Sequence, residues 1–229
     1  MTGSFKVPFL RSRELDHFAD ELLGKYAKKT GKPITAPVPV EAILENYLGL
    51  TMEFKDLEKL LGQPGILGAT WIDKGLVRFD ESLQDGSGRF HFTVAHEIGH
   101  WQMHRPLMIV EREMPVLFNL VDDGDPPPNI VCRTSSREPM EWQADQFAAR
   151  LLMPRTLMLE AFKRFYPEGL QLPKDLCAKD REEDRREWLN KVALEMVRSG
   201  GFSNCSREAM RIRIEGLKLV DCSGSRPLL

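Results

Sequence analysis

The sequence feature that most constrains this chain is the pentapeptide His96-Glu97-Ile98-Gly99-His100, which has the pattern HExxH. On an α-helix, residues four apart lie on one face and one turn apart, so the two imidazoles can reach a single metal ion. Glu97 follows the first histidine directly and can approach a water at that ion as a general base. The pattern therefore predicts a helix that carries two metal ligands and a base.

Length and charge limit what surrounds this helix. The chain has 229 residues and a formal net charge of -2. A chain this long buries roughly 70% of its unfolded surface and needs no metal to form a core, so we expect a metal site here to be catalytic rather than structural. The nearly balanced charge excludes a global basic surface for nucleic acid.

The cysteines and the amino-terminal sequence bear on the cellular compartment. Four widely spaced cysteines form no CxxC pair, which excludes a zinc ribbon and favours free thiols: Cys132, Cys177, Cys205 and Cys222. The first residues contain no apolar segment typical of a signal peptide, and no apolar run approaches the ~20 residues that cross a bilayer. We expect a cytoplasmic protein without a membrane segment.

Periodicity and turn residues predict a mostly helical α+β fold. Ser12 is a plausible N-cap of the first helix and Gly31 a plausible stop. Helices are expected over 12–30, 39–48, 88–104, 137–153 and 180–198, with a last one from Ser206. Residues 155–172 are expected to form a further helix and a loop, with Pro167 and Gly169 as breakers. Apolar runs at 50–54, 66–72 and 76–79 predict a small three-stranded antiparallel sheet with a turn at Gly75. Residues 105–136 are expected to be irregular, because they include Asp122 to Pro128 with three consecutive prolines.

A catalytic zinc site needs a third protein ligand and one open position. Met103 and Pro106 stand where the metzincin motif has glycine and histidine, so that class is excluded. His104 lies about 80° round the helix and ~12 Å along it from His96, too far to share the ion. His91 is about 140° off the face of His96, and His17 belongs to another helix without ligand spacing.

Acidic residues are the stronger candidates for the third ligand. Glu141 and Asp145 are four residues apart on the helix predicted over 137–153. One carboxylate could ligate the metal while the other accepts a hydrogen bond from a ligating histidine. The spacing alone does not decide between this interpretation and two ordinary solvated carboxylates. Glu138 and Asp125 are further candidates.

Two motifs together resemble a known family. The sequences HEIGHxxxH, from His96, and ExxADxFAxxLLMP, from Glu141 to Pro154, are similar to the ImmA/IrrE family of intracellular metallopeptidases, over roughly residues 35–155. The resemblance implies a zincin-like domain in which His96, His100 and Glu141 hold one catalytic Zn²⁺, with Mn²⁺ as an alternative in the cell. It further implies that Glu97 is the base and that Asp145 hydrogen-bonds a ligating histidine. The implied substrate is a protein, typically a helix-turn-helix repressor whose cleavage releases its genes, including genes of stress responses.

The carboxyl-terminal sequence is similar to the helix-turn-helix-like tail of that family. Met210, Ile214 and Leu217 share one face of the last predicted helix, and Arg207 and Arg211 share another. We expect a metallopeptidase domain over 1–165 and a helical segment over 166–229 packed on it. Residues 199–229 hold five basic and three acidic residues, few for binding phosphates, so a structural role is favoured over DNA binding.

The favoured function is peptide-bond hydrolysis, with His91, His104 and Tyr166 as candidate groups for stabilising the oxyanion. An extended substrate could add to an edge of the small sheet. Two other classes remain open: a transcriptional regulator that binds DNA through residues 180–220, with a structural or vestigial metal site, and a toxin–antitoxin component that acts by sequestration. The sequence does not predict the oligomeric state.

Overall fold

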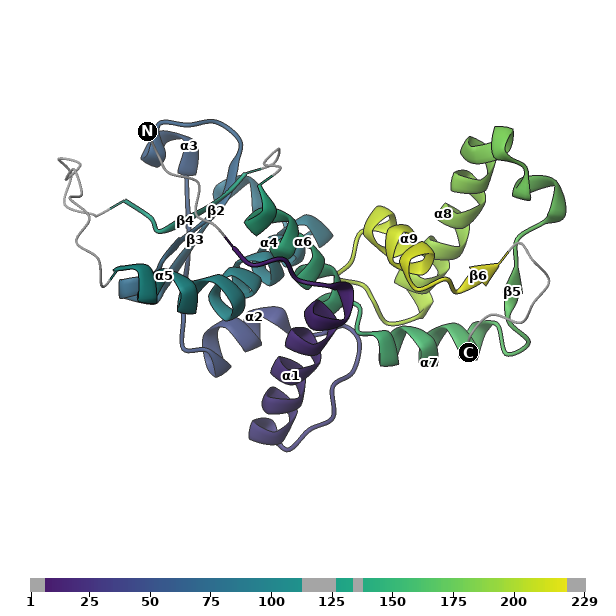
Figure 1. Ribbon diagram of the computed structural model, residues 1–229, viewed down its shortest axis with the longest axis horizontal. Helices are drawn as coiled ribbons and strands as arrows, with labels where there is room; N and C mark the ends of the chain where they lie inside the picture. Colours follow the sequence, from purple (N-terminus) through teal and green to yellow (C-terminus); the bar gives the residue numbers. More distant parts are fainter. Residues whose placement is uncertain (1–6, 113–126, 134–137, 222–229) are drawn as a thin grey trace.

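Figure 1 shows the computed structural model, in which residues 7–112, 127–133 and 138–221 are described. Helices predominate, and one small sheet lies at one end of the long axis. The α+β class expected from the sequence is confirmed. None of the described helices is long and apolar enough to cross a membrane.

The helices follow the predicted order, except that Leu57–Leu61 and Arg105–Arg112 were not expected to be helical. They are α1 (Ser12–Thr30), α2 (Val40–Ala42) continued by a π-helical segment (Ile43–Tyr47), α3 (Leu57–Leu61), α4 (Gly88–Gly99) continued by a second π-helical segment (His100–His104), α5 (Arg105–Arg112), α6 (Pro139–Leu152), α7 (Arg155–Phe165), α8 (Glu182–Ser199) and α9 (Arg207–Gly216). Gly31 ends α1 in the left-handed conformation at φ 68°, as expected. The N-cap of α1 is Arg11 rather than Ser12, because the Arg11 N–H donates to the Glu14 carboxylate.

The main sheet differs from the prediction. It has four strands in the order β1-β3-β2-β4: β1 (Thr51–Lys55), β2 (Ile66–Trp71), β3 (Leu76–Asp80) and β4 (Ile130–Arg133). β2 and β3 form the expected antiparallel hairpin, whereas β1 pairs in parallel with β3. The three-stranded antiparallel sheet was therefore wrong. β3 buries Leu76, Val77 and Phe79, and such a buried central strand takes a partner on each edge.

The segment 105–136 is less irregular than expected. α5 extends the metal-site helix to Arg112, and β4 adds an edge strand to β2. Pro106 suggests a helix end because proline removes an i→i−4 hydrogen bond. The π-helical segment His100–His104 ends two residues before this proline and changes the hydrogen-bond pattern there. Asp122 to Asp125 lie outside the described residues.

The carboxyl-terminal elements share a core with the rest of the chain. One cluster of buried apolar side chains includes Leu15 of α1, Phe147 of α6 and Met210 of α9. Two short strands, β5 (Leu170–Gln171) and β6 (Val220–Asp221), pair in parallel beside α8 and α9 and were not expected. Packing of α9 on the first part of the chain agrees with a structural role. The boundary at residue 165 stays a prediction.

Candidate metal centre

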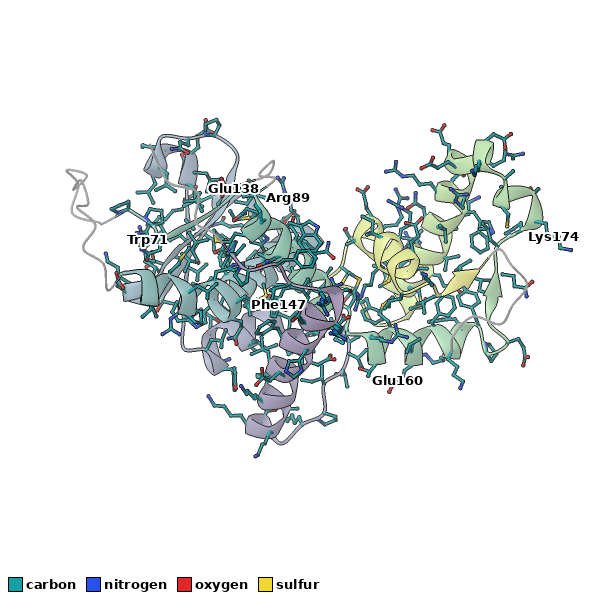
Figure 2. All side chains as sticks on the ribbon, in the orientation of Figure 1. Trp71, Arg89, Glu138, Phe147, Glu160 and Lys174 are labelled. Atoms are coloured by element: carbon teal, nitrogen blue, oxygen red, sulfur yellow. The ribbon has the colours of Figure 1, made fainter. Side chains whose placement is uncertain are left out.

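Two helices, α4 and α6, cross closely and bring the predicted site residues together. Gly99 makes the close approach possible, because a Cβ there would lie 3.0 Å from the Phe147 ring and 3.3 Å from the Ala144 Cα. Phe147 lies in the middle of this crossing (Figure 2). The helix that carries His96 and His100 is thereby apposed to the helix that carries Glu141.

Three buried donors converge between these helices. The Nε2 atoms of His96 and His100 lie 2.9 Å apart. Oxygens of Glu141 lie 3.3 Å from the His96 Nε2 and 3.2 Å from the His100 Nε2. All three residues are buried, with at most 5% of their surface exposed.

The spacing of these donors fits a tetrahedral metal ion. Ligands at ~2.1 Å from a tetrahedral ion lie about 3.4 Å from one another. The two distances to Glu141 are close to that value, and the 2.9 Å between the histidine nitrogens is shorter. Two imidazoles with one carboxylate are a donor set that zinc takes in catalytic sites. The Glu141 Oε2 accepts no hydrogen bond from any described residue, although it is buried. These residues therefore fit the metal that the resemblance implies.

Asp145 orients the first histidine. The His96 Nδ1–H donates to the Asp145 Oδ1 at 2.8 Å, which leaves the Nε2 lone pair directed at the other two donors. Burial alone would lower the pKa of His96, but the Asp145 carboxylate holds it well above its usual value.

A chain of three buried groups orients the second histidine. The His100 Nδ1 lies 2.9 Å from the His104 Nδ1, and the His104 Nε2 lies 3.0 Å from the Gln143 Oε1. The Gln143 amide donates in turn to the Pro8 carbonyl, which fixes its oxygen as the acceptor for His104. His104 therefore donates from Nε2 and accepts at Nδ1, and His100 is left with a free Nε2 lone pair. The sequence excluded His104 as a ligand but did not reveal this contact.

Strand β2 holds the predicted base. The Thr70 hydroxyl donates to the Glu97 Oε2 at 2.6 Å, while the Glu97 Oε1 has no partner among the described residues. Gly68 makes room for this carboxylate, because a Cβ there would lie 2.5 Å from the Oε1. Neither contact could be inferred from the sequence, since β2 is remote from the helix along the chain.

Burial and neighbouring charges shift the pKa values of the site residues in different directions. Burial raises the pKa of Glu97 to about 7 and lowers that of His100 to about 4. Burial would also raise the pKa of Glu141, but its contacts with His100 and His96 lower it to about 2. One carboxylate is thus held ionised for ligation while the other can take up a proton near neutral pH.

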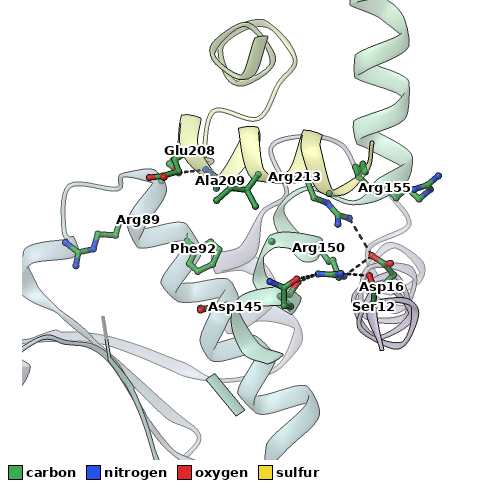
Figure 3. A pocket seen from close by; sticks show the side chains of 17 residues that line it. Ser12, Asp16, Arg89, Phe92, Asp145, Arg150, Arg155, Glu208, Ala209 and Arg213 are labelled. Atoms are coloured by element: carbon green, nitrogen blue, oxygen red, sulfur yellow. Dashed lines mark hydrogen bonds and ion pairs between the residues drawn. The ribbon is translucent and has the colours of Figure 1, made fainter. Parts of the chain in front are cut away.

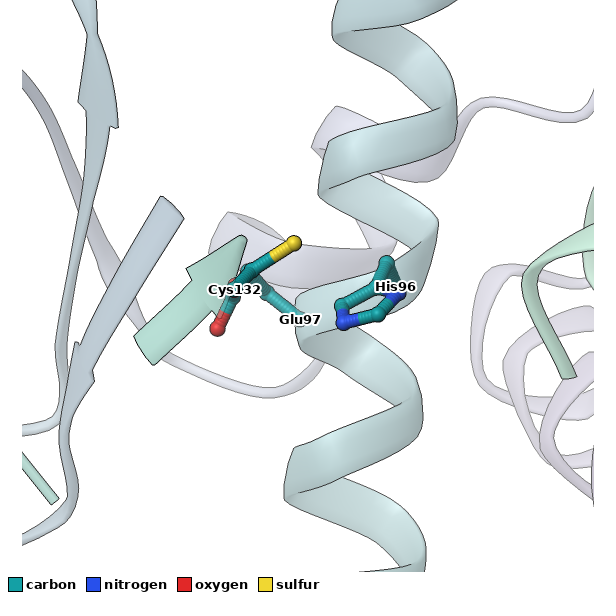
Figure 4. A group of neighbouring side chains, drawn as sticks. All are labelled: His96, Glu97 and Cys132. Carbon is teal, nitrogen blue, oxygen red and sulfur yellow. The ribbon is translucent and has the colours of Figure 1, made fainter. Parts of the chain in front are cut away.

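Cys132 is a site residue that sequence reasoning missed. It lies on β4, and its sulfur, a ring nitrogen of His96 and a carboxylate oxygen of Glu97 all lie within 4.8 Å of one another. Figure 4 shows the Cys132 side chain beside the metal-site helix. The sequence pattern that could have revealed it is the short apolar run Ile130-Val131-Cys132, which is typical of a buried strand.

The other candidates from the sequence lie elsewhere. The His91 ring contacts the Ser87 carbonyl and the Glu41 carboxylate, and the Tyr166 hydroxyl donates to Glu195 of α8. Both His104 nitrogens are engaged behind His100, so none of the three proposed oxyanion groups is directed at the donors. Glu138 is exposed at the N-cap of α6 (Figure 2), and Asp125 lies outside the described residues. His17 is exposed on α1.

A cavity of about 690 Å³ lies behind the metal centre, between α9 and the helices α1, α4 and α6. Figure 3 shows Phe92 and Asp145 on the side of this cavity that α4 and α6 form, with α9 opposite. Asp145 lines the cavity and binds His96, whereas His100, Glu97 and Glu141 do not line it. The cavity is therefore separate from the metal centre.

Comparison with known families decides what this arrangement belongs to. The Peptidase_M78 model, described as the IrrE N-terminal-like domain, matches residues 81–174. Residues 81–174 are thus similar to the IrrE N-terminal-like domain. The match spans α4, the π-helical segment and α6, so every metal-centre residue from His96 to Asp145 lies inside it. It confirms the resemblance to ImmA/IrrE metallopeptidases. No curated protein matches the chain.

Proposed function

We propose that this chain is a zinc-dependent endopeptidase of the cytoplasm that cleaves a protein substrate. The observation that carries the proposal is the convergence of three donors, His96, His100 and Glu141, with the Glu97 carboxylate close to His96. The Oε1 of this carboxylate has no hydrogen-bond partner among the described residues. Such a set leaves one coordination position open, which distinguishes a catalytic zinc site from a structural one.

His96, His100 and Glu141 would hold the ion, and Asp145 and His104 would orient the two imidazoles. When bound, a zinc ion supplies Lewis acidity that lowers the pKa of a water and polarises the scissile carbonyl. Zinc is proposed over Mn²⁺ because two imidazole donors suit zinc, whereas Mn²⁺ prefers oxygen ligands.

Glu97 would perform the proton transfers. The Oε1, with no partner among the described residues, would accept the proton of the attacking water while Thr70 holds the Oε2 in place. Burial keeps the pKa of Glu97 near 7, which suits a group that takes up a proton and then returns it to the leaving amine. Gly68 keeps this carboxylate close to β2.

The family resemblance supports a helix-turn-helix repressor as the substrate, with derepression of its genes as the result. A test is to incubate the purified zinc-loaded chain with the repressor encoded beside its own gene and follow cleavage. We expect cleavage by the wild type and at least about a hundredfold slower cleavage by Glu97→Gln, because general-base catalysis contributes at least that much.

The matched control is the metal content of Glu97→Gln, which should stay at one zinc ion per chain because glutamine preserves shape and Glu97 ligates nothing. An active Glu97→Gln variant would contradict the assignment of the base. Wild-type protein that binds zinc and leaves the repressor intact would contradict the proposed substrate.

Direct DNA binding is the less favoured alternative. Of the two arginines expected to face DNA, Arg211 pairs with Glu208 and Glu215 of its own helix. Glu208 also pairs with Arg186 of α8. Salt-dependent binding of duplex DNA that is lost in Arg207→Ala would support the alternative.

A further inference from the structure

Cys132 is a buried thiol in the metal centre that the proposed mechanism does not use. Only 6% of its surface is exposed, and its sulfur lies within 4.8 Å of a ring nitrogen of His96 and a carboxylate oxygen of Glu97. Both neighbours are themselves buried. The sulfur therefore lies beside the three proposed metal ligands and shares His96 with them.

The pairing of β4 with β2 explains why the sulfur points there. Cys132 is the cross-strand partner of Gly68, the residue that makes room for the Glu97 carboxylate. The register between the two strands shifts between Ile66 and Gly68. Such bulges commonly redirect a side chain beside an active site. Cys132 and Glu97 are thereby brought to the same side of the metal centre.

The open coordination position would lie on that side. His96, His100 and Glu141 would occupy three corners of a tetrahedron, and Glu97 must face the fourth corner to reach a water there. A sulfur that neighbours both His96 and Glu97 lies beside this fourth corner. In a tetrahedral zinc site a sulfur and a nitrogen ligand lie about 3.6 Å apart, so the Cys132 sulfur, now within 4.8 Å of a ring nitrogen of His96, would need to move inward by up to about 1.2 Å with respect to that atom. It would move further with respect to His100 or Glu141, which share no group of close donors with it.

We propose that Cys132 is a fourth, displaceable metal ligand that closes the site until a substrate displaces it. The inference rests on the proposed function, because it needs an ion held by the other three residues. On coordination the S–H bond breaks, the sulfur donates its electron pair to the ion, and the proton passes to solvent. No oxidation is involved.

With Cys132 as the fourth ligand, the site would have no peptidase activity. Four protein ligands complete the tetrahedron, as in structural zinc sites, and leave no position for the water that Glu97 must activate. Thiolate is also a preferred donor for zinc, so the closed form would hold the ion more tightly than three ligands alone. Cys132 would thus restrain the peptidase and retain the metal.

Cobalt substitution tests this directly. Metal-free full-length chain is titrated with Co²⁺, which takes zinc sites and reports sulfur ligation through a thiolate-to-cobalt charge-transfer band. We expect the band in the wild type and its complete loss in Cys132→Ser and Cys132→Ala, with the visible cobalt bands retained. Cys177→Ser is the matched control, since this thiol lies in a short helix of the carboxyl-terminal part, and it should keep the band.

Zinc affinity gives a second readout. Loss of the thiolate should weaken zinc binding by at least about tenfold to hundredfold. Removing a hydrogen-bond partner of a metal ligand already costs that much, and removing a ligand should cost no less. Wild-type cobalt protein without a charge-transfer band, or an unchanged band in Cys132→Ser, would overturn the inference and leave the three-ligand site intact. Failure of the wild type to bind Co²⁺ or Zn²⁺ at all would overturn the proposed function and this inference with it.

Discussion

Glu97 is held in surroundings that oppose its charge. It is buried, its Oε2 accepts from Thr70, and its Oε1 has no partner among the described residues. A carboxylate in such a place ionises reluctantly, because burial removes the water that stabilises the charge. The burial that suits Glu97 to act as a base also lowers the stability of the metal-free protein when this carboxylate is ionised.

This cost predicts a pH dependence of the metal-free protein. Burial raises the pKa of Glu97 to about 7, so the folded chain binds this proton more tightly than the unfolded chain does. The stabilisation is complete below the ordinary pKa of glutamate and is lost as the pH rises through about 7. Glutamine does not titrate. We therefore expect Glu97→Gln to gain thermal stability over the wild type between about pH 5 and about pH 8.

The measurement is thermal unfolding of both proteins in the presence of a chelator, across that pH range. Comparing two variants cancels the titration of all other groups to first order. Parallel curves for the two proteins would show that the pKa of Glu97 is not raised by the fold.

At the scale of elements, His100 is oriented jointly by three helical segments: α4, the π-helical segment after Gly99, and α6. π-Helical turns are uncommon and are frequently found at functional sites. Here the segment carries both His100 and His104, and α6 supplies Gln143 as the acceptor behind them. The ligand His100 is thus oriented by its own helix and by the helix that carries Glu141.

Removing His104 should weaken metal binding without removing a ligand. In His104→Phe the His100 Nδ1–H loses its buried acceptor, so the ring is no longer fixed with its Nε2 toward the ion. We expect about a tenfold to hundredfold lower zinc affinity, measured by competition with a chromophoric chelator. His91→Phe is the control, since His91 lies on α4 but contacts Ser87 and Glu41 instead. Equal affinities of the two variants would contradict the orienting role.

At the scale of the whole molecule, α9 is joined to the first half of the chain by a buried arginine. The Arg213 Nε donates to the Met153 carbonyl at 3.0 Å, and its Nη2 lies 3.6 Å from Asp16 of α1. Arg150 shares the same carboxylate (Figure 3). Burial, together with the nearby Arg150, lowers the pKa of Arg213 to about 10. Three segments far apart in the sequence therefore meet at one charge cluster.

Replacing this arginine should destabilise the fold as a whole. Arg213→Met keeps an unbranched apolar chain but leaves the Met153 carbonyl without this donor, so we expect a loss of about 1–3 kcal/mol in the free energy of unfolding. Urea denaturation measures it. Arg186→Met is the control, because its ion pair with Glu208 is exposed and should contribute less than about 1 kcal/mol. Equal losses would mean that α9 is not anchored through Arg213.

Much of this protein followed from its sequence. Local patterns were sufficient for most of the helices and for the β2–β3 hairpin, because apolar periodicity, capping residues and Gly75 act over a few residues; the short α3 and α5 were not predicted. The HExxH pattern pointed to His96, Glu97 and His100, whereas the spacing of Glu141 and Asp145 left their roles open and the family resemblance assigned them. What failed were features without a local cause: the parallel pairing of β1 with β3, the strand β4 and the continuation of the helix past Pro106.

Only the tertiary structure decided how the site residues are held. Thr70 and Gly68 reach Glu97, and Cys132 reaches His96, because strands far from the metal helix in sequence pack against it. Gln143 and Pro8 complete the support of His100 from two further segments. A sequence pattern records which groups can ligate or titrate. The direction in which each group points and the burial that shifts its pKa arise from neighbours that the chain order does not reveal.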